Sequence, residues 1–128
     1  MSKRILIVED HADIRKLIRM TLEFESFEIH EAASADEGLE MVRQLKPDLL
    51  LLDIMMLGQL DGIDLCRIVK SDPSLGRPQV VILTARAQAK DIETGMNAGA
   101  DAYLLKPFSP LKLIETIDGL DASAAGMP

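Results

Sequence analysis

Three apolar runs in this 128-residue chain each end on polar side chains that can act on a phosphate. The runs and their polar ends are residues 5–8 with Glu9 and Asp10, residues 49–52 with Asp53, and residues 103–105 with Lys106. If the runs are parallel strands of one sheet, three carboxylates and one ammonium meet at its carboxyl edge. Carboxylates held so close raise one another's pKa unless a cation neutralises them. The pattern therefore predicts a divalent cation site that supports phosphoryl transfer.

Hydrophobic periodicity predicts that strands and helices alternate along the chain. The predicted strands are residues 4–8, 27–32, 49–52, 80–84 and 103–105. The predicted helices are residues 12–24, 34–46, a segment carrying Leu65, Ile68 and Val69, residues 90–98, and a last helix that starts at Ser109-Pro110 and carries Leu120. Ser34 and Glu37 have the spacing of a capping box at the start of the second helix. This alternation is typical of an α/β fold with helices on both faces of a parallel sheet.

The strand compositions indicate the order of the sheet. The runs at 5–8, 49–52 and 80–83 are apolar throughout, as expected of central strands, whereas 27–32 alternates and 103–105 is short. With right-handed crossovers, the doubly wound five-stranded sheet is predicted to have the flavodoxin-like order 2-1-3-4-5. Its switch point then lies between the first and third strands, where ligands of open α/β sheets bind. The strand order and the acidic residues thus predict the same crevice.

Composition limits the class of protein. The formal net charge is −7, whereas nucleic acid binding favours positive charge, so we expect no direct nucleic acid binding by this domain. Cys66 is the only cysteine and is interpreted as a small apolar side chain. A lone cysteine cannot form an internal disulfide, and the four-residue apolar run after Arg4 is too short for a signal peptide or a membrane span. We therefore expect a cytoplasmic protein without membrane contact. Residues 1–120 are interpreted as one domain and residues 121–128 as a flexible tail or the start of a linker.

The residue types at the predicted edge favour Mg²⁺ over a nucleotide. The first strand is followed by Glu9-Asp10-His11, without the glycines that a phosphate cradle requires. Carboxylate oxygens in an open site suit Mg²⁺, which keeps several waters. Asp53 is the candidate nucleophile, because a carboxylate can accept phosphorus as an acyl phosphate. Lys106 and Thr84 end neighbouring strands and can contact phosphoryl oxygens.

The combination of five motifs resembles the receiver domain of bacterial two-component response regulators, over roughly residues 3–120. The motifs are Glu9-Asp10, Asp53, Thr84-Ala85, Tyr103 and Lys106-Pro107-Phe108. The resemblance implies a phosphorylation-dependent switch rather than an enzyme, in which Asp53 accepts a phosphoryl group from a histidine kinase or phosphotransfer protein. It also implies that Glu9, Asp10, Asp53 and the backbone carbonyl of Met55 hold Mg²⁺.

The resemblance further implies how the signal leaves the site. Lys106 would pair with the phosphorylated Asp53, Thr84 would follow the phosphoryl oxygens, and Tyr103 would turn inward as a switch aromatic. The bond between Lys106 and Pro107 would be cis. The surface of the helix at 90–98, the strand at 103–105 and the last helix would then bind a downstream protein partner.

Two alternatives to a phosphorylated receiver domain stay open. An aspartyl-nucleophile phosphatase of the haloacid dehalogenase type needs an acid two residues after the nucleophile, where this chain has Met55. A pseudo-receiver would keep the fold without phosphorylation.

The segment Leu57-Gly58-Gln59 departs from the family pattern. Leu57 stands where the family usually has proline, and the segment has one residue more before Asp61-Gly62. Met55 and Arg86 are poor at orienting water, so slow dephosphorylation is expected. His11 is interpreted as an exposed first-turn residue rather than a ligand.

Overall fold

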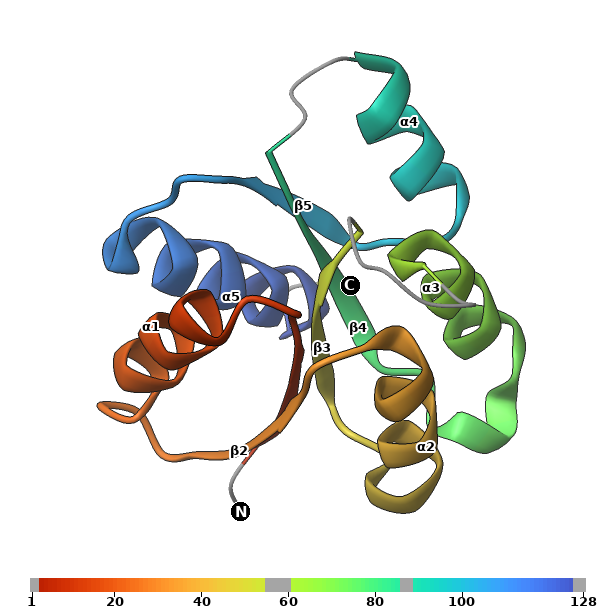
Figure 1. Cartoon of the computed structure of the whole chain (residues 1–128), viewed down its shortest axis with the longest axis horizontal. Coiled ribbons are helices and arrows are strands. Elements are labelled where there is room, and N and C mark those ends of the chain that lie inside the picture. The colour runs from red at the N-terminus through yellow and green to blue at the C-terminus, as the bar shows by residue number, and fades with distance from the viewer. Residues whose placement is uncertain (1–2, 55–60, 86–88, 126–128) are drawn as a thin grey trace.

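The computed structural model describes residues 3–54, 61–85 and 89–125, and shows a five-stranded sheet flanked by helices (Figure 1). The strands are β1 Lys3–Val8, β2 Phe27–Ala32, β3 Leu49–Asp53, β4 Gln79–Thr84 and β5 Ala102–Leu105. The helices are α1 Ala12–Leu22, α2 Ala35–Leu45, α3 Gly62–Ser71, α4 Ala89–Asn97, α5 Pro110–Ala125 and the short 3-10 helix Pro73–Leu75.

The strand order is β2-β1-β3-β4-β5, and the neighbouring strands pair in parallel. This confirms the predicted doubly wound, flavodoxin-like sheet. The two strands expected at the edges, β2 and β5, lie there. The central strands are apolar on both faces because both faces are covered by helices, whereas the edge strands have more exposed positions.

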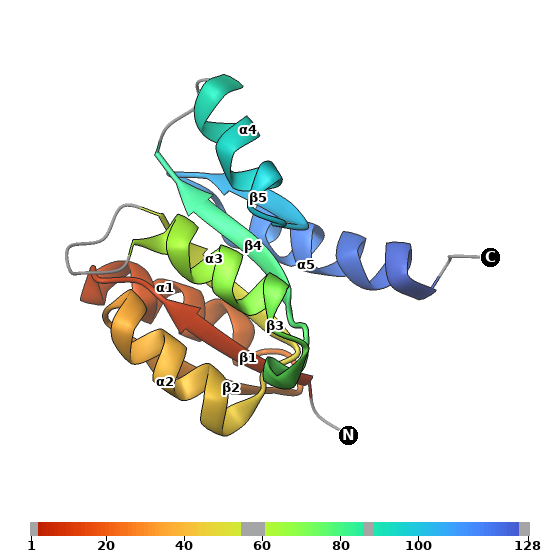
Figure 2. The same cartoon turned by 90° about the vertical axis from the view of Figure 1, so that its right-hand side faces the viewer.

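Alternate residues of the central strands pack into two separate hydrophobic layers. Helices α1 and α5 cover the face that carries Ile5, Leu49 and Leu51, while α2 and α3 cover the face that carries Leu6 and Leu50 (Figures 1 and 2). All five side chains are fully buried. Burial of each such side chain contributes about 1.5–3 kcal/mol, so the layers hold the strand ends in fixed positions.

Local hydrogen bonds set where α2 and α3 begin. The Glu37 main-chain N–H donates to Ser34 Oγ at 3.1 Å, as the capping pattern predicted. The Glu37 carboxylate accepts from the Ala33 main-chain N–H at 2.8 Å, one residue earlier than in a standard capping box. In α3, Asp61 and Asp64 form a complete capping box, because each side chain accepts from the other's main-chain N–H.

Helix α5 extends into the segment interpreted as a flexible tail or the start of a linker. The helix continues to Ala125, and Figure 2 shows α5 extending past the sheet towards the C-terminus. The segment lacks an apolar period, but alanine has the highest helix propensity of all residues. The division into a domain and a tail stays a prediction.

Cys66 lies in the core, as expected, with Sγ donating to the Ala98 carbonyl oxygen at 3.6 Å. Burial raises the pKa of this thiol to about 11.

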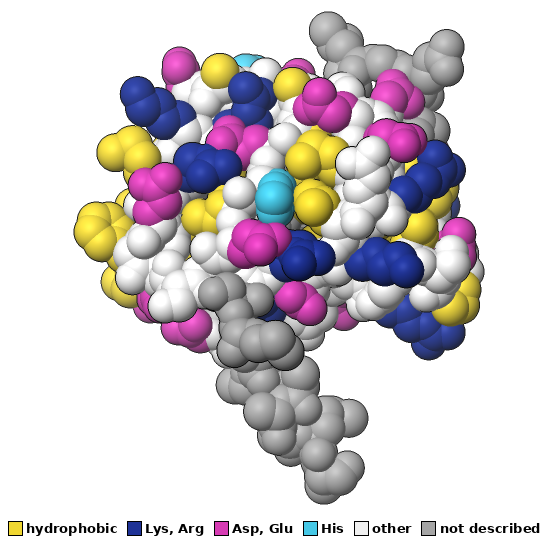
Figure 3. Space-filling model, turned by 90° about the horizontal axis from the view of Figure 1, so that it is seen from below, with side chains coloured by type: hydrophobic (Ala, Val, Ile, Leu, Met, Phe, Trp, Pro, Cys, Tyr) yellow, Lys and Arg dark blue, Asp and Glu magenta, His cyan; other side chains and the backbone are white. Residues whose placement is uncertain are grey.

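On the surface, acidic and basic side chains are interspersed over the face seen in Figure 3. Among the described residues, no helix has both the length and the apolar character needed to cross a membrane.

Candidate functional site

The carboxyl edge of the sheet gathers the acidic side chains that the sequence predicted to converge. Glu9 follows β1 and is fully buried, and Asp53 is the last residue of β3 with 1% exposure. Parallel pairing of β1 with β3 brings the two strand ends side by side. One carboxylate oxygen from each of Glu9, Asp10 and Asp53 and a ring nitrogen of His11 lie within 4.8 Å of one another. The structure therefore brings three predicted ligands together and adds a histidine.

Lys106 follows β5 and extends its ammonium group into this cluster. Its Nζ lies 2.7 Å from Glu9 Oε2 and 3.5 Å from Asp53 Oδ2. The peptide bond between Lys106 and Pro107 is cis, which confirms the expectation from the resemblance. One ammonium group thus contacts two buried carboxylates, and its charge offsets part of their repulsion.

Two groups in the cluster have shifted pKa values that follow from their contacts. Burial would raise the pKa of Glu9, but hydrogen bonds from Lys106 and His11 outweigh it, and the pKa lies below its usual 4.5. The hydrogen bond with Glu9, reinforced by the charge of Asp10, raises the pKa of His11 above its usual 6.5. Glu9 is therefore ionised at neutral pH and carries the negative charge that a cation site needs.

Thr84 ends β4 next to the cluster and is 2% exposed. Its main-chain carbonyl oxygen accepts a 2.7 Å hydrogen bond from the Lys106 main-chain N–H, which ties the ends of β4 and β5 together. Since β3 pairs with β4, this junction lies beside the strand that carries Asp53. The predicted pair Thr84 and Lys106 therefore comes from adjacent strands at one edge.

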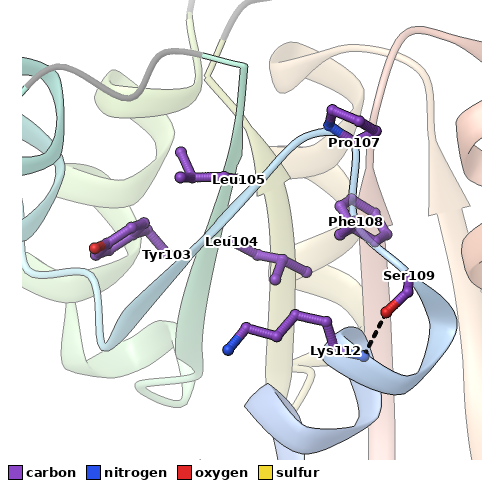
Figure 4. Close-up of a pocket in the computed structure, with 7 residues that line it drawn as sticks. All are labelled: Tyr103, Leu104, Leu105, Pro107, Phe108, Ser109 and Lys112. Carbon is purple, nitrogen blue, oxygen red and sulfur yellow. Dashed lines mark hydrogen bonds between the residues drawn. The ribbon is translucent and has the colours of Figure 1, made fainter.

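Tyr103 lies on β5 with 41% of its surface exposed. Figure 4 shows its ring pointing away from Phe108, on the outer side of the strand. The ring is thus in an outward orientation in this structure, from which an inward movement would start. It borders a pocket of about 530 Å³ that is also lined by Leu104, Leu105, Pro107, Phe108, Ser109 and Lys112.

Part of the predicted site lies outside the described residues. Met55, with its carbonyl ligand, the segment at residues 57–59, and Arg86 belong to this part. The described chain resumes at Asp61, and Gly62 lies against the end of β3. A Cβ at Gly62 would be 2.3 Å from the main-chain oxygen of Asp53. Only glycine fits this approach, so Gly62 allows α3 to start directly beside Asp53.

Sequence reasoning missed two residues that support the cluster. Arg15 on α1 donates from Nη1 to the Glu9 carbonyl oxygen at 2.8 Å and from Nε to Glu31 Oε1 at 3.3 Å. Glu31, on β2, also accepts a hydrogen bond from Arg19. Arg15 lies one helical turn after His11, a spacing that indicates a side chain on the same side of α1.

The donor set fits a hard divalent cation such as Mg²⁺. Asp10 Oδ1 is buried but accepts no hydrogen bond from any described residue, and its 3.0 Å contact with His11 Nδ1 lacks hydrogen-bond geometry. An oxygen in this state is available to a cation without loss of an existing bond. The Asp10 side chain is 30% exposed, so a bound cation could retain waters, as Mg²⁺ prefers.

A model of one protein family matches residues 5–118, and its description is response regulator receiver domain. The chain is a response regulator receiver domain. The match confirms the family resemblance drawn from the five motifs, and with it the assignment to two-component signalling.

Curated relatives and solved structures agree with this family. The receiver domain is 37% identical over 117 residues to the DNA-binding response regulator MtrA of Mycolicibacterium paratuberculosis, which covers 91% of the chain and 50% of the relative. It is 38% identical to the transcriptional regulatory protein ResD of Bacillus subtilis, with 91% and 47% covered. A CheY-like receiver domain protein of Methanospirillum hungatei JF-1 has a TM-score of 0.85 at 35% identity, with 99% and 100% covered. The receiver domain thus spans about half the length of these curated relatives.

Proposed function

We propose that this receiver domain is a switch that takes up a phosphoryl group on Asp53 from the phosphohistidine of a histidine kinase or phosphotransfer protein. The observation that carries the proposal is the placement of Asp53. Its carboxylate is buried at the end of β3, within 4.8 Å of the ligand atoms of Glu9 and Asp10, and 3.5 Å from the Lys106 ammonium. A carboxylate in this position is shielded from bulk water and lies beside a positive charge that can stabilise the incoming phosphoryl group.

The chemistry follows from these side chains. An Asp53 carboxylate oxygen attacks phosphorus, and the new P–O bond forms as the P–N bond to the histidine breaks and its electron pair leaves with the imidazole nitrogen. Lys106 pairs with one phosphoryl oxygen, and the Thr84 hydroxyl donates to another. Glu9, Asp10, Asp53 and the carbonyl of Met55 would hold Mg²⁺, which neutralises charge on the transferred group when bound.

Phosphorylation then changes the balance of contacts around Lys106. The phosphoryl group adds about −1.5 to −2 charge at neutral pH, and so competes with Glu9 for the ammonium group. Movement of Thr84 towards the phosphoryl group leaves space that Tyr103 fills from its outward position. We propose that the face formed by α4, β5 and α5, with the pocket beside Tyr103, binds a downstream protein partner. This face would bind the partner in either the phosphorylated or the unphosphorylated state, but not equally in both.

Labelling with a small phosphodonor tests the proposal. Wild type, Asp53→Asn and the matched control Asp36→Asn, which alters an exposed acid on α2, are incubated with acetyl phosphate and Mg²⁺. Intact-mass spectrometry should show one added phosphoryl group on wild type and Asp36→Asn and none on Asp53→Asn. Omission of Mg²⁺ should abolish labelling of wild type and of Asp36→Asn.

The alternatives predict other results. Equal labelling of wild type and Asp53→Asn would place the phosphoryl group elsewhere and overturn the proposal. A wild type that takes no label and no Mg²⁺ would be a pseudo-receiver. The family match over residues 5–118 speaks against a haloacid dehalogenase-type phosphatase, which would instead turn over a small phosphomonoester.

A further inference from the structure

We propose that His11 is a further metal ligand, which extends the cation site of the proposed function to divalent ions that accept an imidazole nitrogen, such as Co²⁺ and Zn²⁺. The proposal rests on the metal site formed by Glu9, Asp10 and Asp53, and it concerns which ions that site takes. From the sequence alone, His11 is interpreted as an exposed first-turn residue rather than a ligand.

The position of the His11 ring carries the proposal. Its Nδ1 lies 2.8 Å from Glu9 Oε1 and 3.0 Å from Asp10 Oδ1. A ring nitrogen of His11 also lies within 4.8 Å of the ligand oxygen of Asp53. His11 is the N-cap residue of α1, but its side chain makes no capping hydrogen bond to the helix. The ring is therefore directed towards the carboxylates rather than used to stabilise the helix.

The distances match those between ligands of one metal ion. Metal–ligand bonds of about 2.1 Å place neighbouring ligand atoms of an octahedron about 3.0 Å apart. The two contacts of His11 Nδ1 have nearly this length, so the nitrogen already occupies a ligand's place relative to Glu9 and Asp10. Replacement of the hydrogen bond by a shared metal ion would require little movement of the ring, which is 62% exposed.

The two carboxylate oxygens of Glu9 have different partners. Its Oε2 accepts from Lys106 Nζ at 2.7 Å, whereas its Oε1 accepts from the His11 main-chain N–H at 3.3 Å and lies 2.8 Å from His11 Nδ1. The side of the cluster near His11 thus offers an imidazole nitrogen, Glu9 Oε1 and Asp10 Oδ1. Mg²⁺ selects oxygen ligands, while imidazole nitrogen suits later transition metals, so this set favours the latter more than carboxylates alone would.

Metal titration of untagged protein tests the proposal without any phosphoryl transfer. Isothermal titration with Co²⁺ and with Mg²⁺ compares wild type with His11→Ala and His11→Asn. Asparagine is a favourable N-cap residue, so His11→Asn removes the imidazole without weakening the start of α1. His30→Asn is the matched control, since His30 on β2 pairs with Glu28 at 2.9 Å instead of the cluster. The visible spectrum of bound Co²⁺ reports whether its ligand set changes.

Both His11 variants should lose roughly tenfold or more in Co²⁺ affinity, with an altered Co²⁺ spectrum, while their Mg²⁺ affinity stays within about twofold. His30→Asn should match wild type for both ions. Unchanged Co²⁺ binding, or an equal loss for Co²⁺ and Mg²⁺, would overturn the proposal. The proposed function is judged separately by Asp53 labelling, so a His11-dependent Co²⁺ site without labelling would leave the metal proposal standing and remove the function.

Discussion

Arg15 donates a 2.8 Å hydrogen bond to the main-chain carbonyl oxygen of Glu9, and thereby connects α1 to the acidic cluster. The same guanidinium pairs with Glu31 on β2, at 3.3 Å from Nε to Oε1. The Arg15 side chain is only 20% exposed, so this connection is largely shielded from solvent. Arg15 contacts no carboxylate oxygen of Glu9, and therefore supports the backbone of the site rather than binding a ligand itself.

Replacement of Arg15 by methionine should weaken metal binding without removing any ligand. Methionine keeps the apolar stem but frees the Glu9 carbonyl oxygen and leaves Glu31 with Arg19. We expect Mg²⁺ affinity to fall roughly tenfold and unfolding free energy by about 1.5–3 kcal/mol. Titration calorimetry and urea unfolding measure the two effects. Arg43→Met, which breaks an exposed pair with Glu40, is the control and should change neither by much.

Removal of the Lys106 ammonium should make stability depend on Mg²⁺. Lys106→Met leaves Glu9 buried without its cationic partner, so we expect a loss of up to about 3 kcal/mol in metal-free buffer. A bound cation replaces the missing positive charge, and the deficit relative to wild type should shrink when Mg²⁺ is added. Urea unfolding with and without Mg²⁺ measures this, with the exposed Lys112→Met as control. A deficit of the same size in both buffers would contradict the expected role of Lys106 charge.

A pair of glycine substitutions should have opposite effects. Gly62→Ala places a Cβ 2.3 Å from the Asp53 main-chain oxygen, and the backbone shift this requires should cost about 1–3 kcal/mol and lower Mg²⁺ affinity. In Gly119→Ala the new Cβ meets no atom within 4 Å, and alanine in helix α5 should stabilise by roughly 0.5–1 kcal/mol. Thermal unfolding distinguishes the two. Equal effects would show that the contact at Gly62 is relieved elsewhere.

The contribution of Asp72 to stability should be lost only at strongly acidic pH. Its carboxylate accepts hydrogen bonds from the Ser74 hydroxyl and main-chain N–H, which hold its pKa below the usual 3.8. The contribution is therefore complete above pH 3.8 and is lost as the pH falls through the lowered pKa. Asp72→Asn cannot titrate, so its difference from wild type should depend on pH only in this range. Urea midpoints at several acidic pH values, with Asp36→Asn as control, check this.

The sequence alone determined the order of the elements and the meeting of Asp53, Asp10 and Lys106 at one edge. Apolar runs in central strands and helical periodicity are local signals that the sequence carries directly. Parallel pairing then places the carboxyl ends of all the strands at the same edge of the sheet. The identity of the family followed from motifs that this geometry requires. The sequence did not predict where α5 ends, because residues 121–125 carry no periodic apolar signal.

Only the tertiary structure decided how the side chains within the cluster share their contacts. The bond from Arg15 to the Glu9 carbonyl, the nitrogen of His11 beside two carboxylates, and the contact of Gly62 with Asp53 depend on how α1, α3 and two strand ends are placed. Such contacts change with shifts of about 1 Å in backbone or rotamer, which residue types and spacing do not encode. They follow from the packing of the helices on the sheet.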